Sequence, residues 1–290
     1  MMDRRRFLAI AAAFAAAPAS AAQSWSGRAL GANVQITIHG PDNISGPALR
    51  HARAVLQRVE ALFSLYKPSS TLSALNRSGA LSAPAPEFLS LLQHADKVHH
   101  LTDGLFDPTI QPVWSAMARG EDPRTAIARM GWRHVMLDRK GVRLGKDQAL
   151  TFNGIAQGFA SDLVSAGLRH HGAAKTLVNL GEFRANGGPW RIGIEDPAAG
   201  LVGNHTITDS ALATSSPDAM ALGAGHHILH PNARTIWSSV TIEATNATLA
   251  DGLSTAATMM TQERIATLLA NKDVKRITLV DHTGDVTSLT

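Results

Sequence analysis

Residues 151–162, which read TFNGIAQGFASD, run from an extended segment through a glycine turn into a helical pattern. Gly154 and Gly158 would let the backbone approach a ligand closely, and the first N–H groups of the helix would point toward that ligand. The spacing is neither G-x-G-x-x-G nor a phosphate loop, which needs a lysine that this turn lacks. The same glycines could instead let the helix pack tightly on a strand, so the turn alone leaves both roles open.

Asp251 and Thr255 lie four residues apart in the segment ADGLSTA, so on a helix both side-chain oxygens project from one face. A carboxylate with a hydroxyl suits a hard cation such as Mg²⁺, which fills its other positions with water, carbonyls or substrate phosphates. The alternative is structural: Asp251 could cap the helix while Thr255 bonds back to a carbonyl.

Two further polar segments could have either a functional or a purely structural role. Residues 101–109, LTDGLFDPT, close one predicted helix and open another, and Asp107 could serve only as the cap ahead of Pro108 at the first helical position. Tyr66, the only tyrosine, lies in LYKPSSTLSALN and could be a surface aromatic at a helix end.

Three histidines, His226, His227 and His230, are close enough in sequence to suggest zinc or copper. The glycines before them and Pro231 after them leave room only for a short extended segment, in which His227 points away from the other two. This geometry argues against a three-histidine metal site and favours a single histidine that acts as a base.

Both helices and strands are predicted to position these residues. Alternating or buried-strand patterns predict strands, and 3.6-residue periodicity predicts helices. Strands are predicted at 33–39, 176–180, 190–195, 238–244 and 276–280, a hairpin at 134–144, and helices at 47–65, 86–101, 124–130, 155–170, 249–260 and 262–270. Their clustering favours an α+β fold over a doubly wound sheet. No repeat or linker follows residue 25, so one compact domain with mixed sheets and flanking helices is expected.

Composition narrows the class of protein. The chain has 290 residues, of which 44% are hydrophobic, as in a soluble globular protein. It contains no cysteine, which excludes disulfides, thiolate metal sites, cysteine nucleophiles and a lipid-anchoring cysteine. Without residues 1–21, which carry three arginines and one aspartate, the formal charge falls from +4 to +2. So small a charge, with no basic run, predicts no nucleic-acid partner.

Residues 1–21 have the pattern of an export signal: a basic start, a short apolar run and a small-residue exit at residues 19–21. The apolar run, about ten residues, is too short for a retained transmembrane helix. Paired arginines ahead of Phe7 and Leu8 favour the twin-arginine route over an ordinary secretory signal with a basic head. Either route predicts a periplasmic mature protein, residues 22–290, that does not itself span the membrane.

Taken together and in this order, these segments resemble the ApbE family of FAD-dependent protein flavinyltransferases. The resemblance extends from about Leu30 to the C-terminus and implies one ApbE-like domain over residues 22–290. It is carried by the blocks ALGANVQITI, LFSLYKPSSTLSALN, TDGLFDPTIQPVW, TFNGIAQGFASD, LVNLGEFRANG, WRIGIEDP, ALATSS, HHILHP and SVTIEATNATLADGLSTA. The last block and the segment TDGLFDPT are the most specific.

The resemblance implies a chemistry for the polar residues. Family members bind FAD with Mg²⁺, split its pyrophosphate and move FMN onto a threonine or serine hydroxyl of an acceptor protein, so that AMP leaves. The implied metal ligands are Asp251, Thr255 and the carbonyl of Gly154, with Asp251 essential to catalysis. A cation there would neutralise the charge on the transferred phosphoryl group, so no phosphate-loop lysine is required. His227 matches the general base, a task that suits an imidazole with a pKa near 6.5.

The resemblance also assigns contacts with the cofactor. Tyr66 matches an aromatic residue stacked on the isoalloxazine ring, and Leu30 falls near the flavin, at a position that is usually methionine. The other predicted cofactor contacts are Leu105, Phe106, Asp107, Thr151, Gln157 and Ile228.

The chain also departs from the family pattern at polar positions: Thr151 replaces a carboxylate, Gln157 replaces a residue that is often charged, and Ser216 replaces a glycine. The usual Asp-Pro-x-Thr-Gly element is replaced by residues 230–234, HPNAR, so that His230 stands where a second carboxylate is usual. Each lost carboxylate removes a charge-assisted hydrogen bond of about 1.5–3 kcal/mol. Weaker FAD binding or altered recognition of ribose or adenine is expected.

The sequence thus predicts an exported FAD:protein FMN transferase whose partner is a redox protein with a flavinylated Thr or Ser. Two alternatives use the same scaffold. One is an FAD pyrophosphatase, in which water replaces the acceptor hydroxyl. The other is a non-catalytic periplasmic flavin carrier or assembly factor, which the lost carboxylates at Thr151 and His230 motivate.

Overall fold

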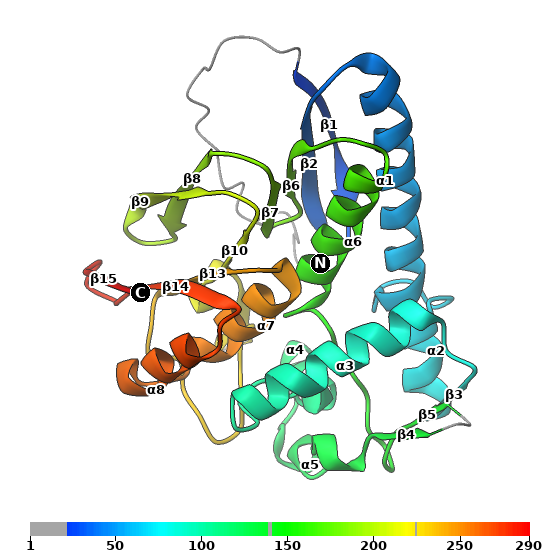
Figure 1. Cartoon of the computed structure of the whole chain (residues 1–290). Helices are drawn as coiled ribbons and strands as arrows, with labels where there is room; N and C mark the ends of the chain where they lie inside the picture. The colour runs from blue at the N-terminus through cyan, green and yellow to red at the C-terminus, as the bar shows by residue number, and fades with distance from the viewer. Residues whose placement is uncertain (1–21, 139–140, 224) are drawn as a thin grey trace.

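The computed structural model describes residues 22–138, 141–223 and 225–290. Helices and antiparallel sheets combine in one domain, which confirms the predicted α+β class (Figure 1). The predicted export signal, residues 1–21, lies outside the described residues, and β1 begins at Ala22.

An eight-stranded antiparallel sheet forms the centre of the fold. Its order is β1–β2–β6–β7–β10–β13–β14–β15, so neighbours in the sheet come from distant parts of the chain. The strands are β1 (Ala22–Ala29), β2 (Ala32–His39), β6 (Lys175–Asn179), β7 (Phe183–Asn186), β10 (Ala211–Ser215), β13 (Ser239–Ala244), β14 (Val274–Val280) and β15 (Val286–Leu289).

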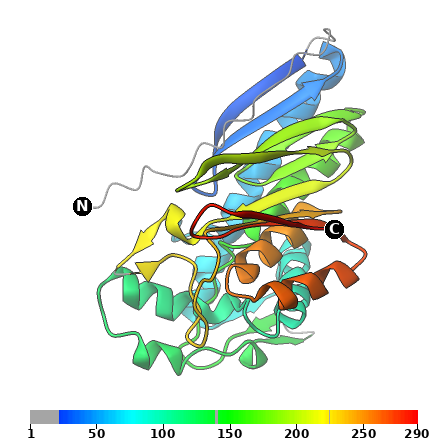
Figure 2. The same ribbon diagram turned by 90° about the vertical axis from the view of Figure 1, so that its left-hand side faces the viewer.

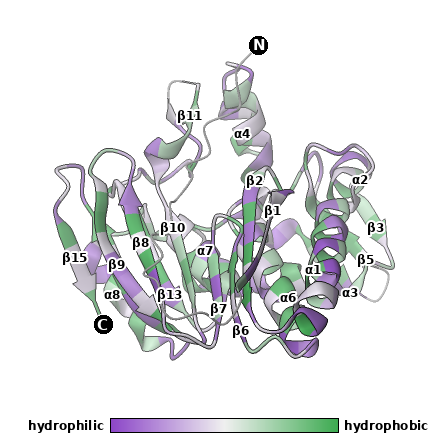
Figure 3. Cartoon of the chain, turned by 90° about the horizontal axis from the view of Figure 1, so that it is seen from above, coloured by the Kyte–Doolittle hydropathy of each residue, from purple (hydrophilic) through white to green (hydrophobic). Residues whose placement is uncertain are grey.

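Three helices pack on this sheet: α1 (Asp42–Phe63), α6 (Ala156–His170) and α7 (Ala247–Ala257). The buried residues of α1 follow one stripe at helical spacing, namely Ala48, Ala52, Leu56, Val59 and Leu62. Helix α6 lies against α1 and also against α7 (Figure 3). These helices and the sheet enclose the main hydrophobic core.

A hairpin of β8 (Trp190–Asp196) and β9 (Gly200–Ile207) packs on the sheet with a second, smaller core. Trp190, Ile192 and Ile194 of β8 alternate inward there and meet Leu177 and Phe183 of the sheet.

The rest of the fold is mainly helical. It contains α2 (Thr71–Ser78), α3 (Pro86–Leu101), the 3₁₀ turn η1 (Pro108–Ile110), α4 (Gln111–Ala118), α5 (Arg124–Ile127), η2 (Trp132–His134) and a small sheet of β3 (Ala80–Ser82), β5 (Gly141–Arg143) and β4 (Met136–Asp138). After β10 come η3 (Pro217–Ala219), β11 (Ala221–Leu222) and β12 (Gly225–His226), and after α7 come α8 (Gln262–Ala266) and η4 (Thr267–Ala270). The β11–β12 segment lies beside α4 (Figure 2).

Most predicted elements are present, and two helices begin two or more residues before the predicted start. The helix predicted at 47–65 begins five residues earlier, at Asp42, and contains Pro47. Proline removes only the bond to the carbonyl of Asn43, an exposed residue whose carbonyl water can satisfy. The helix predicted at 249–260 is α7, which begins at Ala247 because Asn246 caps it. Among the described residues, no helix has both the length and the hydrophobicity needed to cross a bilayer.

Candidate functional site

The glycine turn and α6 lie in close contact with α7. A Cβ on Gly158 would lie 2.2 Å from the carbonyl oxygen of Ala247 and 2.8 Å from the Cβ of Asp251. A Cβ on Gly154 would lie 2.9 Å from Thr255 Oγ1. Both glycines are therefore needed for close approach, and the neighbour they approach is a helix rather than the predicted strand.

Two polar contacts join the turn to this helix. The Thr255 hydroxyl donates to the carbonyl oxygen of Gly154 over 3.5 Å, and Asp251 Oδ2 accepts a bond from the Gly158 N–H at 2.9 Å. The three predicted metal ligands are thus gathered at one helix contact, although Gly154 lies about a hundred residues before the other two.

The capping alternative for Asp251 is wrong. The side chain of Asn246 caps α7 by accepting from the Leu249 N–H at 2.8 Å. Asp162 of α6 accepts from the N–H groups of Ala247 and Thr248 and so satisfies two more donors of the first turn. Asp251 therefore lies inside the helix, and its carboxylate is directed at α6.

The site gathers two buried carboxyl groups, Asp251 and Glu182. Burial raises the pKa of Asp251 to about 7; the Gly158 hydrogen bond opposes this shift, and the charge of Asp162 adds to it. Burial also raises the pKa of Glu182 well above its usual value, the charge of Asp251 raises it further, and a bond from the Thr214 N–H opposes the rise. Two buried carboxylates cannot both ionise cheaply, and a nearby cation would favour the ionised forms.

The donor set fits a hard divalent cation. It offers one carboxylate, one hydroxyl and one backbone carbonyl, all oxygen ligands of the kind that Mg²⁺ prefers. Within residues 22–138, 141–223 and 225–290, no group of three or more His, Asp or Glu side chains is arranged to hold a metal. An ion at this contact would therefore complete its coordination with water or substrate oxygens.

Sequence reasoning missed Ser215 as a site residue. Its hydroxyl lies 2.8 Å from Ser254 Oγ and 3.4 Å from Thr255 Oγ1. Ser215 ends β10 in the block ALATSS, whose place beside α7 follows only from the sheet order. Two residues later, the Pro217 carbonyl contacts His227, so this strand end connects the predicted metal ligands to the predicted base.

Two backbone carbonyls define the tautomer that a neutral His227 adopts. Its Nδ1 lies 3.2 Å from the carbonyl oxygens of both Pro217 and Met220. Carbonyls only accept, so Nδ1 carries the hydrogen and Nε2 retains its lone pair. Burial lowers the pKa of His227, while the hydrogen bonds to Met220 and Pro217 oppose that shift.

The other two histidines have separate surroundings. His226 Nδ1 lies 2.9 Å from Asp218 Oδ1. His230 forms an isolated bridge with Ala233, and burial lowers the pKa of His230, an effect that the charge of Asp107 opposes. The replaced carboxylate position, His230, thus lies within the field of the predicted cofactor residue Asp107.

The 101–109 segment does form the helix connector that the alternative interpretation describes. Asp107 caps η1, and its Oδ1 accepts from the N–H and hydroxyl of Thr109 at 2.8 and 2.7 Å. The Pro108 carbonyl accepts from the Thr151 N–H at 2.8 Å, so two predicted cofactor segments meet here. Phe106 is buried in the main core, and Leu105 packs against it.

The remaining predicted contacts are more dispersed. Leu30 occupies the turn between β1 and β2 with φ +50° and packs against the main core. Tyr66 follows α1, is 62% exposed, and has its backbone N–H bonded to Ser64 Oγ. Gln157 of α6 faces Gly181, and Ile228 is buried beside His227.

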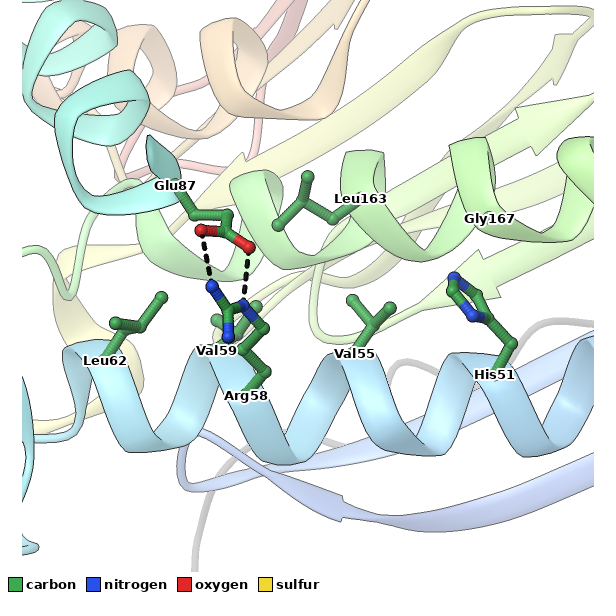
Figure 4. A pocket seen from close by; sticks show the side chains of 8 residues that line it. All are labelled: His51, Val55, Arg58, Val59, Leu62, Glu87, Leu163 and Gly167. Carbon is green, nitrogen blue, oxygen red and sulfur yellow. Dashed lines mark hydrogen bonds and ion pairs between the residues drawn. The ribbon is translucent and has the colours of Figure 1, made fainter. Parts of the chain in front are cut away.

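A separate cavity of about 170 Å³ lies between α1, α6 and the start of α3 (Figure 4). Its walls are mainly apolar, and at its edge Arg58 donates to both carboxylate oxygens of Glu87, at 2.5 and 2.9 Å. None of its lining residues is a predicted site residue, and its two charged groups already satisfy each other.

Comparisons with known proteins show the family to which the chain belongs. The model of the ApbE family matches residues 30–278. Two relatives named FAD:protein FMN transferase, from Haemophilus influenzae and Vibrio cholerae, are 26% identical over 204 residues and 28% over 248. The matches cover 60% and 72% of this chain, and 58% and 72% of those proteins.

Solved structures support the fold. The flavin transferase ApbE from Vibrio cholerae superposes with a TM-score of 0.81 at 23% identity, covering 93% of this chain and 97% of that one. The ApbE protein from Thermotoga maritima gives 0.83 at 24%, covering 92% and 97%.

Proposed function

Because the chain belongs to the ApbE family, we propose that it is an Mg²⁺-dependent FAD:protein FMN transferase. The observation that carries this proposal is the meeting of Gly154, Asp251 and Thr255 at the contact of the glycine turn with α7. These oxygens would hold the cation, which when bound neutralises charge on the linked phosphates of FAD.

In the proposed transfer, His227 acts as the base. The acceptor hydroxyl gives its proton to Nε2 of His227, which the carbonyls of Pro217 and Met220 leave as the basic nitrogen. The hydroxyl oxygen then bonds to the FMN phosphorus, and the bond from that phosphorus to the bridging oxygen breaks. AMP leaves with the bridging oxygen and its electron pair.

The cofactor contacts follow the same assignment. The exposed ring of Tyr66 would stack on the isoalloxazine, with Leu30 near the flavin. Asp107 and Thr151, joined through Pro108, would contact the cofactor together with Leu105, Phe106, Gln157 and Ile228.

We further propose that the protein acts outside the cytoplasm and that its partner is an exported redox protein with an acceptor Thr or Ser. Support comes from the twin-arginine pattern of residues 1–21, because that route delivers folded proteins.

The test combines purified protein, FAD, MgCl₂ and a flavin-accepting redox subunit. Transfer predicts a fluorescent covalent band on the acceptor in a denaturing gel, with AMP released in equal amount. The band should be absent with EDTA and with an acceptor whose Thr or Ser is replaced by alanine.

FAD hydrolysis is the second candidate, because Nε2 of His227 could also take a proton from water. The carboxylates missing at Thr151 and His230 motivate the third candidate, a non-catalytic carrier. Release of AMP and free FMN at full rate without acceptor would favour hydrolysis. FAD that stays bound and intact would favour a carrier.

A further inference from the structure

The side chain of Asn76, in α2, holds the backbone of Leu150 with two hydrogen bonds. Its Oδ1 accepts from the Leu150 N–H at 2.7 Å, and its Nδ2 donates to the Leu150 carbonyl at 2.8 Å. The two residues are 74 apart in sequence. An amide side chain paired in this way imitates the edge of a neighbouring β-strand.

This pairing replaces a strand that the segment lacks. Residues 148–152 belong to no sheet, yet Leu150 and Phe152 are buried, so their backbone groups need partners from elsewhere. Asn76 satisfies both groups of Leu150, and the Pro108 carbonyl accepts from the next N–H, that of Thr151. Two side-by-side contacts therefore fix where the chain enters the glycine turn.

Four residues after Leu150 the chain reaches Gly154, the first of the proposed metal ligands. Phe152 packs edge-on against the stacked rings of Phe63 and Phe88, and its carbonyl accepts from the N–H groups of Ile155 and Ala156. The turn then presents the Gly154 carbonyl to Thr255 Oγ1 at 3.5 Å. A shift of Leu150 would also move the Gly154 carbonyl, because the segment between them is too short to absorb the displacement.

We propose that Asn76 is a positioning residue for the Gly154 carbonyl, and thus for cation binding. The inference rests on the proposed metal site. Asn76 itself touches neither ion nor substrate; it acts through Leu150, as an outer partner that orients a ligand.

The experiment measures the affinity of the folded protein for Mn²⁺ alone, by electron paramagnetic resonance of free Mn²⁺, without FAD. In Asn76→Asp the acceptor for the Leu150 N–H remains, but the donor is lost and a charge faces the Leu150 carbonyl. Asn76→Ser removes both bonds. Each variant should bind Mn²⁺ about tenfold or more weakly than wild type, in the range expected for outer partners of metal ligands. Folding is checked by circular dichroism at the same temperature.

Two reference variants separate the possible outcomes. Asn43→Asp makes the same chemical change at an exposed position of α1 and should leave Mn²⁺ affinity unchanged. Asp251→Asn should abolish tight binding. No binding by wild type, or equal binding by Asp251→Asn, would refute the metal site of the proposed function. If wild type binds and Asn76→Asp and Asn76→Ser bind within twofold of it, the positioning role is overturned while the metal site stands. Failure of both Asn76 variants to fold would assign Asn76 to folding and also overturn the proposal.

Discussion

Asp251 Oδ2 accepts a hydrogen bond from the backbone N–H of Gly158 at 2.9 Å, across 93 residues of sequence. This N–H belongs to the first turn of α6, where it has no partner inside the helix. The bond thus satisfies a helix end and orients the carboxylate at the same time. Close packing makes it possible, because a Cβ on Gly158 would lie 2.8 Å from the Cβ of Asp251.

Gly158→Ala should separate α6 from α7. Its methyl group would lie 2.2 Å from the Ala247 carbonyl oxygen, and backbone cannot move aside as a flexible side chain can. Overpacking of this kind lowers the free energy of unfolding by about 1–3 kcal/mol, which urea denaturation measures. Gly203→Ala is the matched control, because a Cβ there meets nothing within 4 Å. Equal stability of the two variants would contradict the tight contact.

Asp251→Asn should stop flavin transfer without unfolding the protein. The amide oxygen can still accept from Gly158, but the charge that would hold the cation is lost. We expect the transfer rate to fall at least about 100-fold, the upper end of what losing an outer partner costs. The metal-free variant should resist urea at least as well as wild type, since a neutral amide is easier to bury than a carboxylate. Asp285→Asn, at an exposed turn, should retain full activity; transfer by Asp251→Asn at the wild-type rate would contradict the metal assignment.

The sequence predicts well the elements whose pattern is long and local. Helix α3 coincides with the predicted range 86–101, and α6 begins one residue later than predicted. The spacing of Asp251 and Thr255 also placed both residues correctly on one helix, α7, because a four-residue interval needs no tertiary information.

Elements that depend on distant partners were not predictable in the same way. The five-residue strand β10 was not predicted, since its neighbours β7 and β13 define it more than its own pattern does. Ser215, at its end, reaches Ser254 only through that pairing. The sequence also allows Asp251 to cap α7, because an aspartate near the start of a helix often has that role. Only the structure shows that Asn246 and Asp162 satisfy the first turn.

His205 should make the protein less stable in acid. Burial lowers the pKa of His205, the charge of Arg276 lowers it further and that of Glu243 opposes the shift. Its Nδ1 is buried without a hydrogen-bond partner among the described residues. The unfolded chain, with a pKa near 6.5, therefore binds the proton more readily, and the free energy of unfolding falls as pH drops below 6.5. Between pH 7.5 and 5.5, urea denaturation should show a smaller loss for His205→Gln than for wild type.

The matched control for this change is His282→Gln, at an exposed turn, which should lose as much stability in acid as wild type does. An equal acid loss in wild type and His205→Gln would show that the buried imidazole is not a source of the pH dependence.

His227 should set the acid limb of the transfer rate. A base must be unprotonated, and burial lowers the pKa of His227 below its ordinary value of 6.5. At saturating Mg²⁺ and FAD, the rate should therefore rise with pH through a midpoint below 6.5 and level off above it. His227→Asn removes the base, so the rate should fall about 100-fold or more, the range that general bases contribute.

The same measurement on His226→Asn distinguishes the base from its neighbour. His226 pairs with Asp218, and the electrostatic effect of His226 lowers the pKa of His227, so this variant should keep the acid limb and shift it only toward higher pH. Since Nδ1 of His227 is bound to two carbonyls, Nε2 is the nitrogen that accepts the proton. An acid limb that persists unchanged in His227→Asn would assign the base to another group.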